Sequence, residues 1–428
     1  MLRSSPHRRP HSDPSSRDLC SRPRHRVNVT DKLHGEPAAL QLFGKSEAAH
    51  HVTDTPGRSH ITPHSDMSHV QTVSKWIERV LNRAAIVSER QPLPSVRRSL
   101  LDVSILTGSD ILVTGGTGSF GRAFVQHALD RLNPRRIIVF SRDELKQWEV
   151  RQLFGDDSRL RFFLGDVRDR ARLLRAMHRV DYVVHAAALK QVDSGEYNPW
   201  EFVQTNVIGS QNVIEASIDS GVKRVVALST DKASSPINLY GATKLTADKL
   251  FINGNHYAAA YDTRFAVVRY GNVMGSRGSI IPKFRALHAA GQSLPITDLR
   301  CTRFLITLPQ AVEFVVDSFE LMTGGELYVP RIPSMKVTDL AEAIAPGAKM
   351  HDVGLRPGEK LHEEMISPEE GRRALTVGNR FVLQPDLATW GYLAPEGGVP
   401  VSEGFHYSSN TNDQWYSIEE IQKILEVD

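Results

Sequence analysis

The sequence predicts an α/β fold built on a doubly wound parallel sheet, with helices on both faces of the sheet. Short apolar runs recur along the chain from Ile111 onward, and they are nearly continuous, as in strands that are buried on both faces. Amphipathic helical patterns separate these runs, and such alternation is typical of parallel sheets. A glycine-rich turn joins the first strand to the first helix, where the backbone must change direction sharply.

The predicted strands and helices alternate through the middle of the chain. The strands are short, apolar and bounded by turn residues, and they span residues 110–114, 135–140, 160–165, 180–188, 223–230 and 264–273. The helices carry apolar residues at helical spacing, and they span residues 121–129, 144–154, 171–178, 199–221 and 238–254. Strands joined by such crossover helices predict a Rossmann-type domain.

Composition divides the chain into three predicted parts. Residues 1–66 are rich in Arg, His, Ser and Pro, so residues 1–104 are predicted to be a mostly disordered extension, with one candidate helix over 73–87. A targeting peptide and a histidine-based metal site are the alternatives. Residues 105–270 form the predicted Rossmann domain. Residues 271–428 hold short helices and isolated strands, and they predict a smaller substrate-binding lobe.

The overall composition excludes several classes of protein. Hydrophobic residues make up 40% of the chain and charged residues 24%, with a net charge of +3, as in ordinary globular proteins. No basic stripe with interleaved aromatic residues appears, so no nucleic-acid partner is expected. Cys20 and Cys301 cannot form a disulfide framework or a CxxC metal site, which favours the cytoplasm and no metal. No apolar run has the length of a membrane span, which is about 18 residues or more.

The first turn, TGGTGSFG, has the features of a phosphate-binding loop. Glycines let the backbone turn tightly and approach a pyrophosphate, whose charge rests on the following helix N-terminus. The spacing is GxxGxxG, one residue longer in its first gap than the dehydrogenase fingerprint, and a plain strand–helix turn is the alternative. The predicted cofactor contacts of this loop are Gly115, Thr117, Gly118, Ser119, Phe120 and Gly121.

The end of the second strand bears on the choice of cofactor. An acid in this place holds the ribose 2′-hydroxyl of NAD, whereas an Arg accommodates the 2′-phosphate of NADP. Ser141 and Arg142 come before Asp143, so NADP is favoured over NAD, with a surface ion pair of Arg142 with Asp143 or Glu144 as the alternative. The other predicted cofactor contacts lie after the second, third and fourth strands, and they are Lys146, Asp166, Val167, Ala186, Ala187 and Ala188.

Tyr240 and Lys244 form a YxxxK motif on a predicted helix. Their side chains lie one turn apart on the same face, and a Lys cation beside a phenol favours the phenolate by lowering its pKa. Tyr240 is therefore a candidate general base, and both residues are candidate cofactor contacts. A surface helix with an ordinary contact between the two side chains is the alternative.

Several motifs together resemble one enzyme family. The order of TGxxGxxG, a Ser-Thr pair and YxxxK resembles the extended short-chain dehydrogenase/reductases. Within that family, the chain is similar to the inverting UDP-N-acetylglucosamine 4,6-dehydratases that begin pseudaminic-acid synthesis. The segments that carry this resemblance lie within about residues 105–428, and they read FSRDELKQ, HAAALKQV, STDKASSPINLYGATK, VRYGNVMGSRGSIIP, TRFLIT and RPGEKLHEEM.

The resemblance implies a role for each residue of the motif STDK and of YxxxK. Tyr240 and Lys244 would serve oxidation at carbon 4 of the sugar. Lys232 would be the base at carbon 5, which requires a depressed pKa from burial near Lys244 and other cations. Asp231 would be the acid at carbon 6, and Thr230 would hydrogen-bond a substrate oxygen. An ion pair that merely closes the loop is the alternative for Asp231 and Lys232.

The resemblance also implies substrate contacts and partners. Lys190, Asn272 and Arg277 match positions that contact the sugar nucleotide, and Arg356 and Glu359 match positions that hold the diphosphate and the uridine ribose. Each of them is a surface charge or polar group in the alternative reading. Family members associate through the helices beside the catalytic tyrosine, so a homo-oligomer is expected.

Two other functions remain open at this point. A UDP-N-acetylhexosamine epimerase, or a bifunctional dehydratase–epimerase, would use the same scaffold. An NADP-sensing protein without activity would typically lack the tyrosine that this chain has as Tyr240. Relatives that retain the configuration of the sugar carry Asp-Glu where this chain has Asp231 and Lys232. Large membrane-bound relatives carry Met at the place of Tyr240. Both differences favour the small inverting type of enzyme.

Overall fold

The structure is a computed structural model that describes residues 104–275 and 280–427. These residues fall within one compact unit of the chain. The predicted extension over residues 1–104 and the candidate helix over 73–87 lie outside the described residues, except for Ser104.

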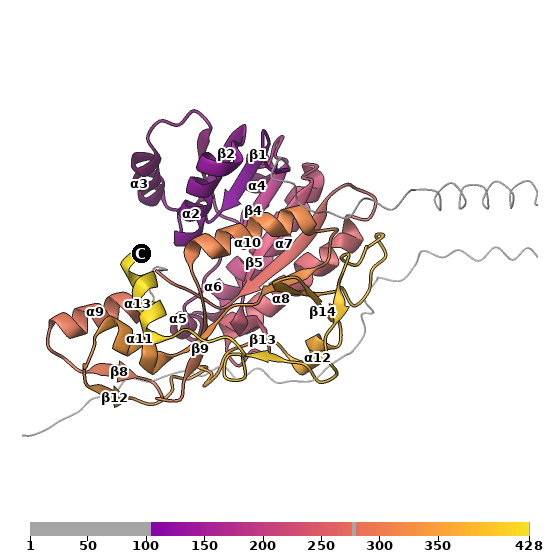
Figure 1. The fold of residues 1–428 in the computed structure, drawn as a ribbon. Coiled ribbons are helices and arrows are strands. Elements are labelled where there is room, and N and C mark those ends of the chain that lie inside the picture. The colour runs from indigo at the N-terminus through magenta and orange to yellow at the C-terminus, as the bar shows by residue number, and fades with distance from the viewer. Residues whose placement is uncertain (1–103, 276–279, 428) are drawn as a thin grey trace, which may run out of the picture. The chain divides into compact units, whose positions relative to one another are not determined.

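A ten-stranded sheet organises the described chain (Figure 1). Its strand order is β16-β14-β15-β10-β6-β5-β4-β1-β2-β3. The predicted strands are confirmed as β1 (Asp110–Thr114), β2 (Arg136–Ser141), β3 (Leu160–Leu164), β4 (Tyr182–His185), β5 (Arg224–Thr230) and β6 (Arg264–Tyr270). They pair in parallel, and β10 (Leu327–Pro330) joins β6 in parallel as well. The antiparallel edge consists of β15 (Arg380–Leu383), β14 (Ala374–Val377) and β16 (Val399–Pro400).

Helices cover both faces of this sheet, which confirms the predicted α/β class. One face is covered by α2 (Ser119–His127) and α10 (Leu308–Leu321), which pack together, with α3 (Glu144–Phe154) beside β2. The other face is covered by α4 (Arg170–Ala176), α7 (Gly209–Asp219) and α8 (Leu239–Tyr257). The strand order reverses between β1 and β4, and parallel sheets bind ligands at the carboxyl ends of the strands where the order reverses.

The helix predicted over residues 199–221 is wound less regularly than its sequence suggests. It consists of α6 (Pro199–Phe202), a π-helical segment η2 (Val203–Ile208) and α7, and the short α5 (Val192–Tyr197) precedes it. Within η2, Asn206 accepts a hydrogen bond from the backbone N–H of Leu189 at 2.8 Å and donates to the Leu189 carbonyl at 2.9 Å. Its amide also donates to Thr243 of α8 at 3.1 Å. Asn206 therefore fixes the loop after β4 against the helix that carries the YxxxK motif.

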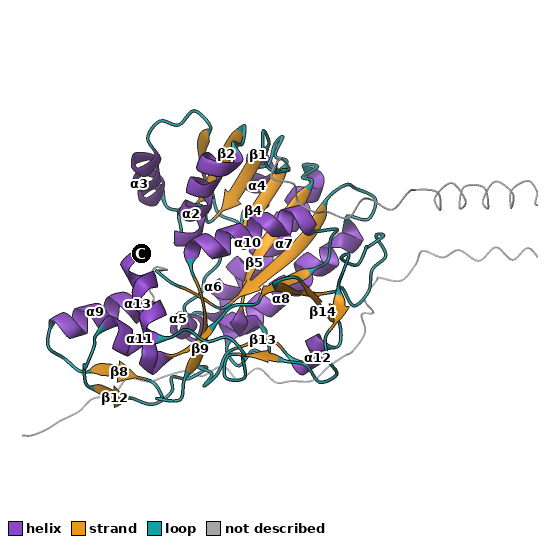
Figure 2. Cartoon of the chain, viewed as in Figure 1, coloured by secondary structure: helices purple, strands orange, loops and turns teal. Residues whose placement is uncertain are grey.

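The second half of the chain contributes to the large sheet and also forms smaller elements (Figure 2). The small helices are α9 (Ile280–Ala289), α11 (Val337–Ile344), α12 (Pro368–Gly371) and α13 (Ile418–Val427). The small strands are β7 (Asn272–Val273), β8 (Leu294–Ile296), β9 (Thr302–Ile306), β11 (Ser334–Lys336), β12 (Met350–Asp352), β13 (Glu364–Ile366) and β17 (Tyr407–Ser408). Helices α9, α11 and α13 pack around apolar clusters separate from the main core. The boundary near residue 270 stays a prediction, and the sheet continues across it through β10.

Candidate active site

A cavity of about 1110 Å³ lies at the carboxyl ends of the central strands, lined by residues from both halves of the chain. It gathers nearly all the predicted site residues. From the cofactor set it contains Gly115, Thr117, Gly118, Ser119, Phe120, Gly121, Ser141, Arg142, Asp143, Lys146, Val167, Ala186, Ala187 and Ala188. From the catalytic and substrate sets it contains Thr230, Asp231, Lys232, Tyr240, Lys244, Lys190, Asn272, Arg356 and Glu359. Asp166 lies beside the cavity rather than in its lining, and Arg277 lies outside the described residues.

The glycine turn brings backbone close to the base of this cavity. Gly115 has a φ of +68°, and a Cβ atom there would lie 2.9 Å from backbone atoms of Ala186 and Ala187. A Cβ atom on Gly121 would lie 2.5 Å from the Cα atom of Gly116, so the helix packs directly on the turn. No side chain caps the N-terminus of α2. The turn and the helix thus form the cradle that a pyrophosphate requires.

The polar residues after β2 do not form the ion pair that the alternative reading expected for Arg142. The Arg142 guanidinium lies 3.6 Å from Asp166 at the end of β3, and its side chain is about half exposed. Asp143 instead caps α3 by accepting from the Lys146 backbone N–H at 3.0 Å, and the Lys146 ammonium lies 2.6 Å away. These contacts lower the pKa of Asp143. Arg142 therefore lines the cavity and is ion-paired with Asp166 rather than with Asp143 or Glu144.

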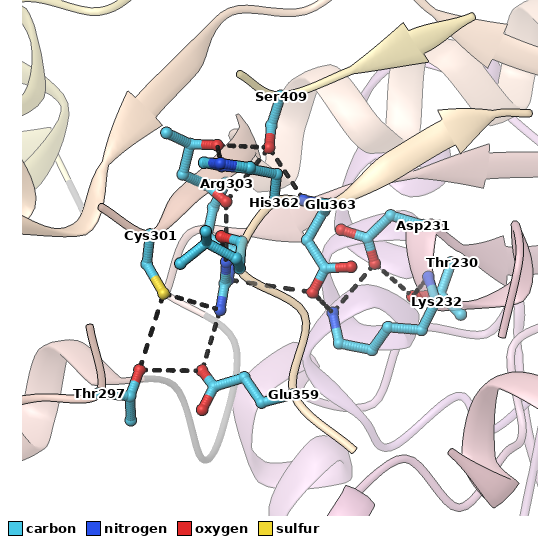
Figure 3. A network of polar contacts seen from close by, with 12 residues as sticks. Thr230, Asp231, Lys232, Thr297, Cys301, Arg303, Glu359, His362, Glu363 and Ser409 are labelled. Carbon is cyan, nitrogen blue, oxygen red and sulfur yellow. Dashed lines mark hydrogen bonds and ion pairs between the residues drawn. The ribbon is translucent and has the colours of Figure 1, made fainter. Parts of the chain in front are cut away.

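The motif STDK spans the end of β5 and the short 3₁₀ turn η3 (Asp231–Ala233), which places three polar side chains together (Figure 3). The Thr230 hydroxyl donates to Asp231 Oδ1 at 2.9 Å, and the Lys232 ammonium donates to the same oxygen at 3.0 Å. Helix α8 packs tightly on this turn, since a Cβ atom on Gly241 would lie 2.1 Å from the Lys232 carbonyl. Asn238 begins α8 and accepts from the Gly241 N–H at 2.7 Å.

The depressed pKa that was expected for Lys232 is wrong in this structure. Burial disfavours the Lys232 ammonium, but the carboxylates of Asp231 and Glu363 outweigh burial and raise its pKa above the usual value. The two carboxylate oxygens lie 3.0 Å and 3.1 Å from Nζ. Lys232 therefore carries a proton at neutral pH in the protein without substrate.

The pKa of Tyr240 also differs from the expectation. Burial raises it to about 12, and the cation that opposes this rise is Lys232, aided by a hydrogen bond with Thr230. Burial lowers the pKa of Lys244, whose ammonium donates to the Leu228 carbonyl at 2.8 Å. The phenol of Tyr240 is thus protonated at neutral pH unless a further positive charge comes close to it.

Sequence reasoning missed two charged residues beside this motif, Glu363 and Arg303. Arg303 lies on β9, is 8% exposed, and donates to Glu359 at 2.9 Å and to the Leu361 carbonyl at 3.0 Å. Glu363 precedes β13 and is 2% exposed (Figure 3). An Arg inside the apolar run TRFLIT was the available signal for Arg303. The segment LHEEM gave no signal that separates Glu363 from its neighbour Glu364.

The predicted substrate residues lie at the more open part of the cavity. Arg356 is exposed, and its guanidinium lies 3.1 Å from Glu359 and 3.8 Å from Asp193. Asn272 on β7 and Lys190 after β4 are exposed. Lys190 and Asn272 are thus accessible to a ligand, whereas the Arg356 guanidinium is held in ion pairs with Glu359 and Asp193.

The described residues hold neither a membrane span nor a metal site. None of the helices there is long and apolar enough to cross a bilayer. Likewise, residues 104–275 and 280–427 contain no group of three or more His, Cys, Asp or Glu side chains placed to hold a metal ion.

Comparisons with known proteins show the family of this chain. The family described as polysaccharide biosynthesis protein matches residues 111–385. The UDP-N-acetylglucosamine 4,6-dehydratase (inverting) of Campylobacter jejuni subsp. jejuni serotype O:23/36 (strain 81-176) is 49% identical over 329 residues, which cover 75% of this chain and 98% of that protein. These matches confirm the resemblance drawn from the motifs and the expectation of a dehydratase, which is a hydro-lyase.

Solved structures show the same fold. Pen from Bacillus thuringiensis superposes with a TM-score of 0.69 at 36% identity, covering 76% of this chain and 99% of that one. DesIV, a dTDP-glucose 4,6-dehydratase from Streptomyces venezuelae with NAD and TYD bound, gives a TM-score of 0.53 at 26% identity and covers 59% of this chain and 86% of its own. The chain therefore belongs to the polysaccharide biosynthesis protein family, within the extended short-chain dehydrogenase/reductases.

Proposed function

We propose that this protein is an NADP-dependent enzyme that dehydrates UDP-N-acetylglucosamine with inversion at carbon 5. The product would be UDP-2-acetamido-2,6-dideoxy-β-L-arabino-hexos-4-ulose. One observation carries the proposal: Tyr240 with Lys244 and Asp231 with Lys232 line the same cavity. A single redox step needs only the first pair, whereas elimination of water needs a further acid and base.

The first pair serves oxidation at carbon 4. Tyr240 accepts the proton of the carbon-4 hydroxyl while a hydride leaves the same carbon, and Thr230 holds the substrate oxygen next to the phenol. A bound oxidised nicotinamide dinucleotide would supply the hydride acceptor for carbon 4, the hydride that carbon 6 later receives, and a positive ring charge that favours the phenolate of Tyr240. Lys244, held one turn away on α8, adds positive charge on the same side.

The second pair serves elimination. The carbon-4 ketone acidifies the carbon-5 proton, which passes to the Lys232 amine as the carbon-5–carbon-6 double bond forms. The carbon-6 hydroxyl takes a proton from Asp231 and leaves as water. Carbon 6 then receives a hydride, and carbon 5 receives a proton on the face opposite to the one from which its proton was removed. The sugar therefore undergoes no net oxidation.

The raised pKa of Lys232 sets a condition on this step, because the amine must lose its proton before it can act as a base. Lys232 donates to Asp231 Oδ1 across 3.0 Å, and Asp231 Oδ2 is buried without a hydrogen-bond partner among the described residues. Transfer of the proton from Lys232 to Asp231 would produce the free amine and the protonated carboxyl in one event. Both groups would then have the charge that elimination requires.

The proposed cofactor is NADP. The glycine turn and the uncapped start of α2 would hold the pyrophosphate, and Arg142 with Lys146 would face a 2′-phosphate. Tyr240 and Lys244 would contact the nicotinamide ribose. The structural relative DesIV was solved with NAD, so the phosphate preference rests on Arg142 in this chain.

The proposal includes the substrate contacts and the surroundings of the enzyme. Arg356 and Glu359, together with Lys190, Asn272 and Arg277, would bind the UDP-sugar, since Arg is well suited to a diphosphate. Tyr197, Trp200 and Ile208 are exposed apolar side chains on helices that pack beside α8, which supports a homo-oligomer there. Such an enzyme would work in the cytoplasm and supply pseudaminic-acid or related surface-glycan synthesis.

Proton NMR of UDP-N-acetylglucosamine, incubated with the full chain in deuterated water, tests the proposal. We expect a new carbon-6 methyl signal with deuterium at carbon 5 and the L-arabino configuration. An unchanged carbon-6 hydroxymethyl group with inverted carbon 4 would identify an epimerase and contradict the roles given to Asp231 and Lys232.

A further inference from the structure

Glu363 lies 131 positions after Lys232 in the sequence, yet its carboxylate lies 3.1 Å from the Lys232 ammonium. The Glu363 side chain is 3% exposed, and its second oxygen is buried without a partner among the described residues. Lys232 therefore lies between two buried carboxylates, those of Asp231 and Glu363 (Figure 3). The proposed mechanism uses only the first of them.

The backbone around Glu363 is fixed on both sides. Its N–H donates to the Ser409 hydroxyl at 2.9 Å, and its carbonyl accepts from the Ser409 N–H at 2.8 Å. The Ser408 hydroxyl donates to the same carbonyl at 3.2 Å, and the Ser409 hydroxyl bonds with Thr302 at 2.7 Å. With this support, the Glu363 backbone cannot move away from Lys232 without breaking several buried hydrogen bonds, so the carboxylate is presented to Lys232 from a fixed position of the chain.

Glu363 faces a side cavity and not the main one. The side cavity has a volume of about 100 Å³ and adjoins the main cavity, and Lys232 lines both. Among the described residues that line the main cavity, Glu363 does not appear. A substrate in the main cavity would therefore contact Lys232, while Glu363 would contact Lys232 from the side cavity.

The charges around Lys232 favour its protonated form. The charged groups that act on Lys232 are the carboxylates of Asp231 and Glu363 and, in the opposite sense, the guanidinium of Arg303, and the Tyr240 phenol is close enough to be influenced by Lys232. The other titratable side chains that line the side cavity are Asp193, Arg356, Glu359 and Lys360. Arg303 is the nearest opposing cation, but its Nη2 donates to Glu359 at 2.9 Å and its Nε lies 3.9 Å from Glu363. Glu363 is thus only partly neutralised by Arg303, and it stabilises the Lys232 ammonium.

We propose that Glu363 is a positioning residue that holds Lys232 beside Asp231 and retains the proton that the two residues share. This inference rests on the proposed function, because it assigns Lys232 the role of the base at carbon 5. The active pair carries one proton, which moves from Lys232 to Asp231 to create acid and base. If that proton is lost to solvent, Asp231 has none to give to the carbon-6 hydroxyl, and elimination stops.

A dependence on pH follows from this arrangement. With both carboxylates present, the raised pKa of Lys232 keeps the shared proton in place to high pH. Glu363→Gln removes one carboxylate but keeps the shape and a hydrogen-bond acceptor, so the proton would be lost at lower pH. An opposite charge at this distance shifts a pKa by about 1–3 units. The alkaline decline of kcat should therefore move down by about 1–3 pH units in Glu363→Gln.

The experiment measures kcat against pH for the wild type, Glu363→Gln, Glu363→Asp and Glu364→Gln, with ordinary and carbon-5-deuterated UDP-N-acetylglucosamine. Glu364 is the adjacent carboxylate, and it accepts from Ser234 and Ser235 rather than from Lys232. We expect the decline of kcat at alkaline pH to move only in Glu363→Gln. In that alkaline range the carbon-5-deuterated substrate should react more slowly than the ordinary one. Glu363→Asp, which restores the charge, should return the decline toward its wild-type position.

The outcomes separate the inference from the proposed function. If the wild type forms the 6-deoxy-4-keto product and Glu363→Gln declines at the same pH as the wild type, the role of Glu363 is wrong and the dehydratase remains. If Glu364→Gln shifts as far as Glu363→Gln, the effect is a general one of charge and the inference is also wrong. If the wild type forms no such product, the proposed function itself fails. Thermal unfolding of each variant checks that it is folded.

Discussion

Replacing Lys232 by Met should separate oxidation from elimination. Methionine has a similar length but no proton to give or accept, so the proposed base at carbon 5 is lost while Tyr240 and Lys244 stay in place. We expect formation of the carbon-6 methyl group to fall by about 10²-fold or more, the size typical of a lost general acid–base group. Oxidation at carbon 4 should still fill the enzyme with the 4-keto intermediate, but more slowly, because Lys232 no longer lowers the pKa of Tyr240.

The same change should also destabilise the fold. The Lys232 ammonium lies 3.0 Å from Asp231 and 3.1 Å from Glu363, and its side chain is 24% exposed. At an effective dielectric constant of about 20, each contact is worth about 5 kcal/mol before the cost of burying the ammonium. Removing one partner of a buried ion pair typically costs about 3–5 kcal/mol, because the remaining charge is left uncompensated. We expect a loss of free energy of unfolding in that range.

The assay combines absorbance with NMR on the full chain. Lys232→Met, supplied with oxidised cofactor and UDP-N-acetylglucosamine, should show a single burst of reduced nicotinamide absorbance without a methyl signal. Denaturant unfolding then compares Lys232→Met with the double variant Lys232→Met/Glu363→Gln, which removes one of the two uncompensated carboxylates. We expect the double variant to be more stable than the single one.

Two results would refute this reasoning. Methyl formation at the wild-type rate in Lys232→Met would show that another group removes the carbon-5 proton. Equal stability of the single and double variants would show that the Glu363 carboxylate is not left uncompensated when Lys232 is removed.

Three further predictions concern the cofactor region and the tyrosine. Gly121→Ala places a Cβ atom 2.5 Å from the Cα atom of Gly116, so we expect a loss of stability of about 1–3 kcal/mol and weaker binding of NADPH. Thermal unfolding measures the first effect and fluorescence titration the second. Arg142→Ala should weaken NADP binding by about 10-fold to 100-fold, as for a lost charged hydrogen bond, and leave NAD binding nearly unchanged; equal losses for both would contradict a 2′-phosphate contact. Burial raises the pKa of Tyr240 to about 12. The phenolate absorbance that the cofactor-free wild type shows and Tyr240→Phe lacks should therefore appear only at strongly alkaline pH. Its appearance near neutral pH would contradict this pKa.

The sequence was informative where one segment determines its own structure. The apolar runs at 110–114 and 224–230 predicted buried strands, and the glycine turn and YxxxK predicted where a cofactor and a base would lie. These signals are local, because a strand, a turn or a helix face depends mostly on its own residues. The predicted long helix over 199–221 was right in extent but missed the π-helical segment, which only tertiary contacts such as those of Asn206 explain.

The charge state of the site could not be predicted in the same way. Lys232 was expected to have a depressed pKa because only Lys244 and burial were visible from the motif. The approach of Glu363 depends on the pairing of β13 with β17 and on Ser409, far from Lys232 in sequence. Electrostatic effects fall off with distance in space and not along the chain, so the sign of the pKa shift required the tertiary structure.

The hydrogen bonds between Glu363 and Ser409 have a consequence for the synthesis of this protein. A polypeptide leaves the ribosome with its N-terminus first, so the glycine turn, Lys232 and Tyr240 emerge long before Ser409. Domains can begin to fold during synthesis, and the parallel strands β1 to β6 can therefore pair before Ser409 has been made. Ser408 and Ser409 fix Glu363 only after they have emerged, 45 and 46 positions after Glu363 itself. The growing chain can therefore assemble the parallel sheet early, whereas the proposed catalytic centre around Lys232 is completed only after Ser409 has been added.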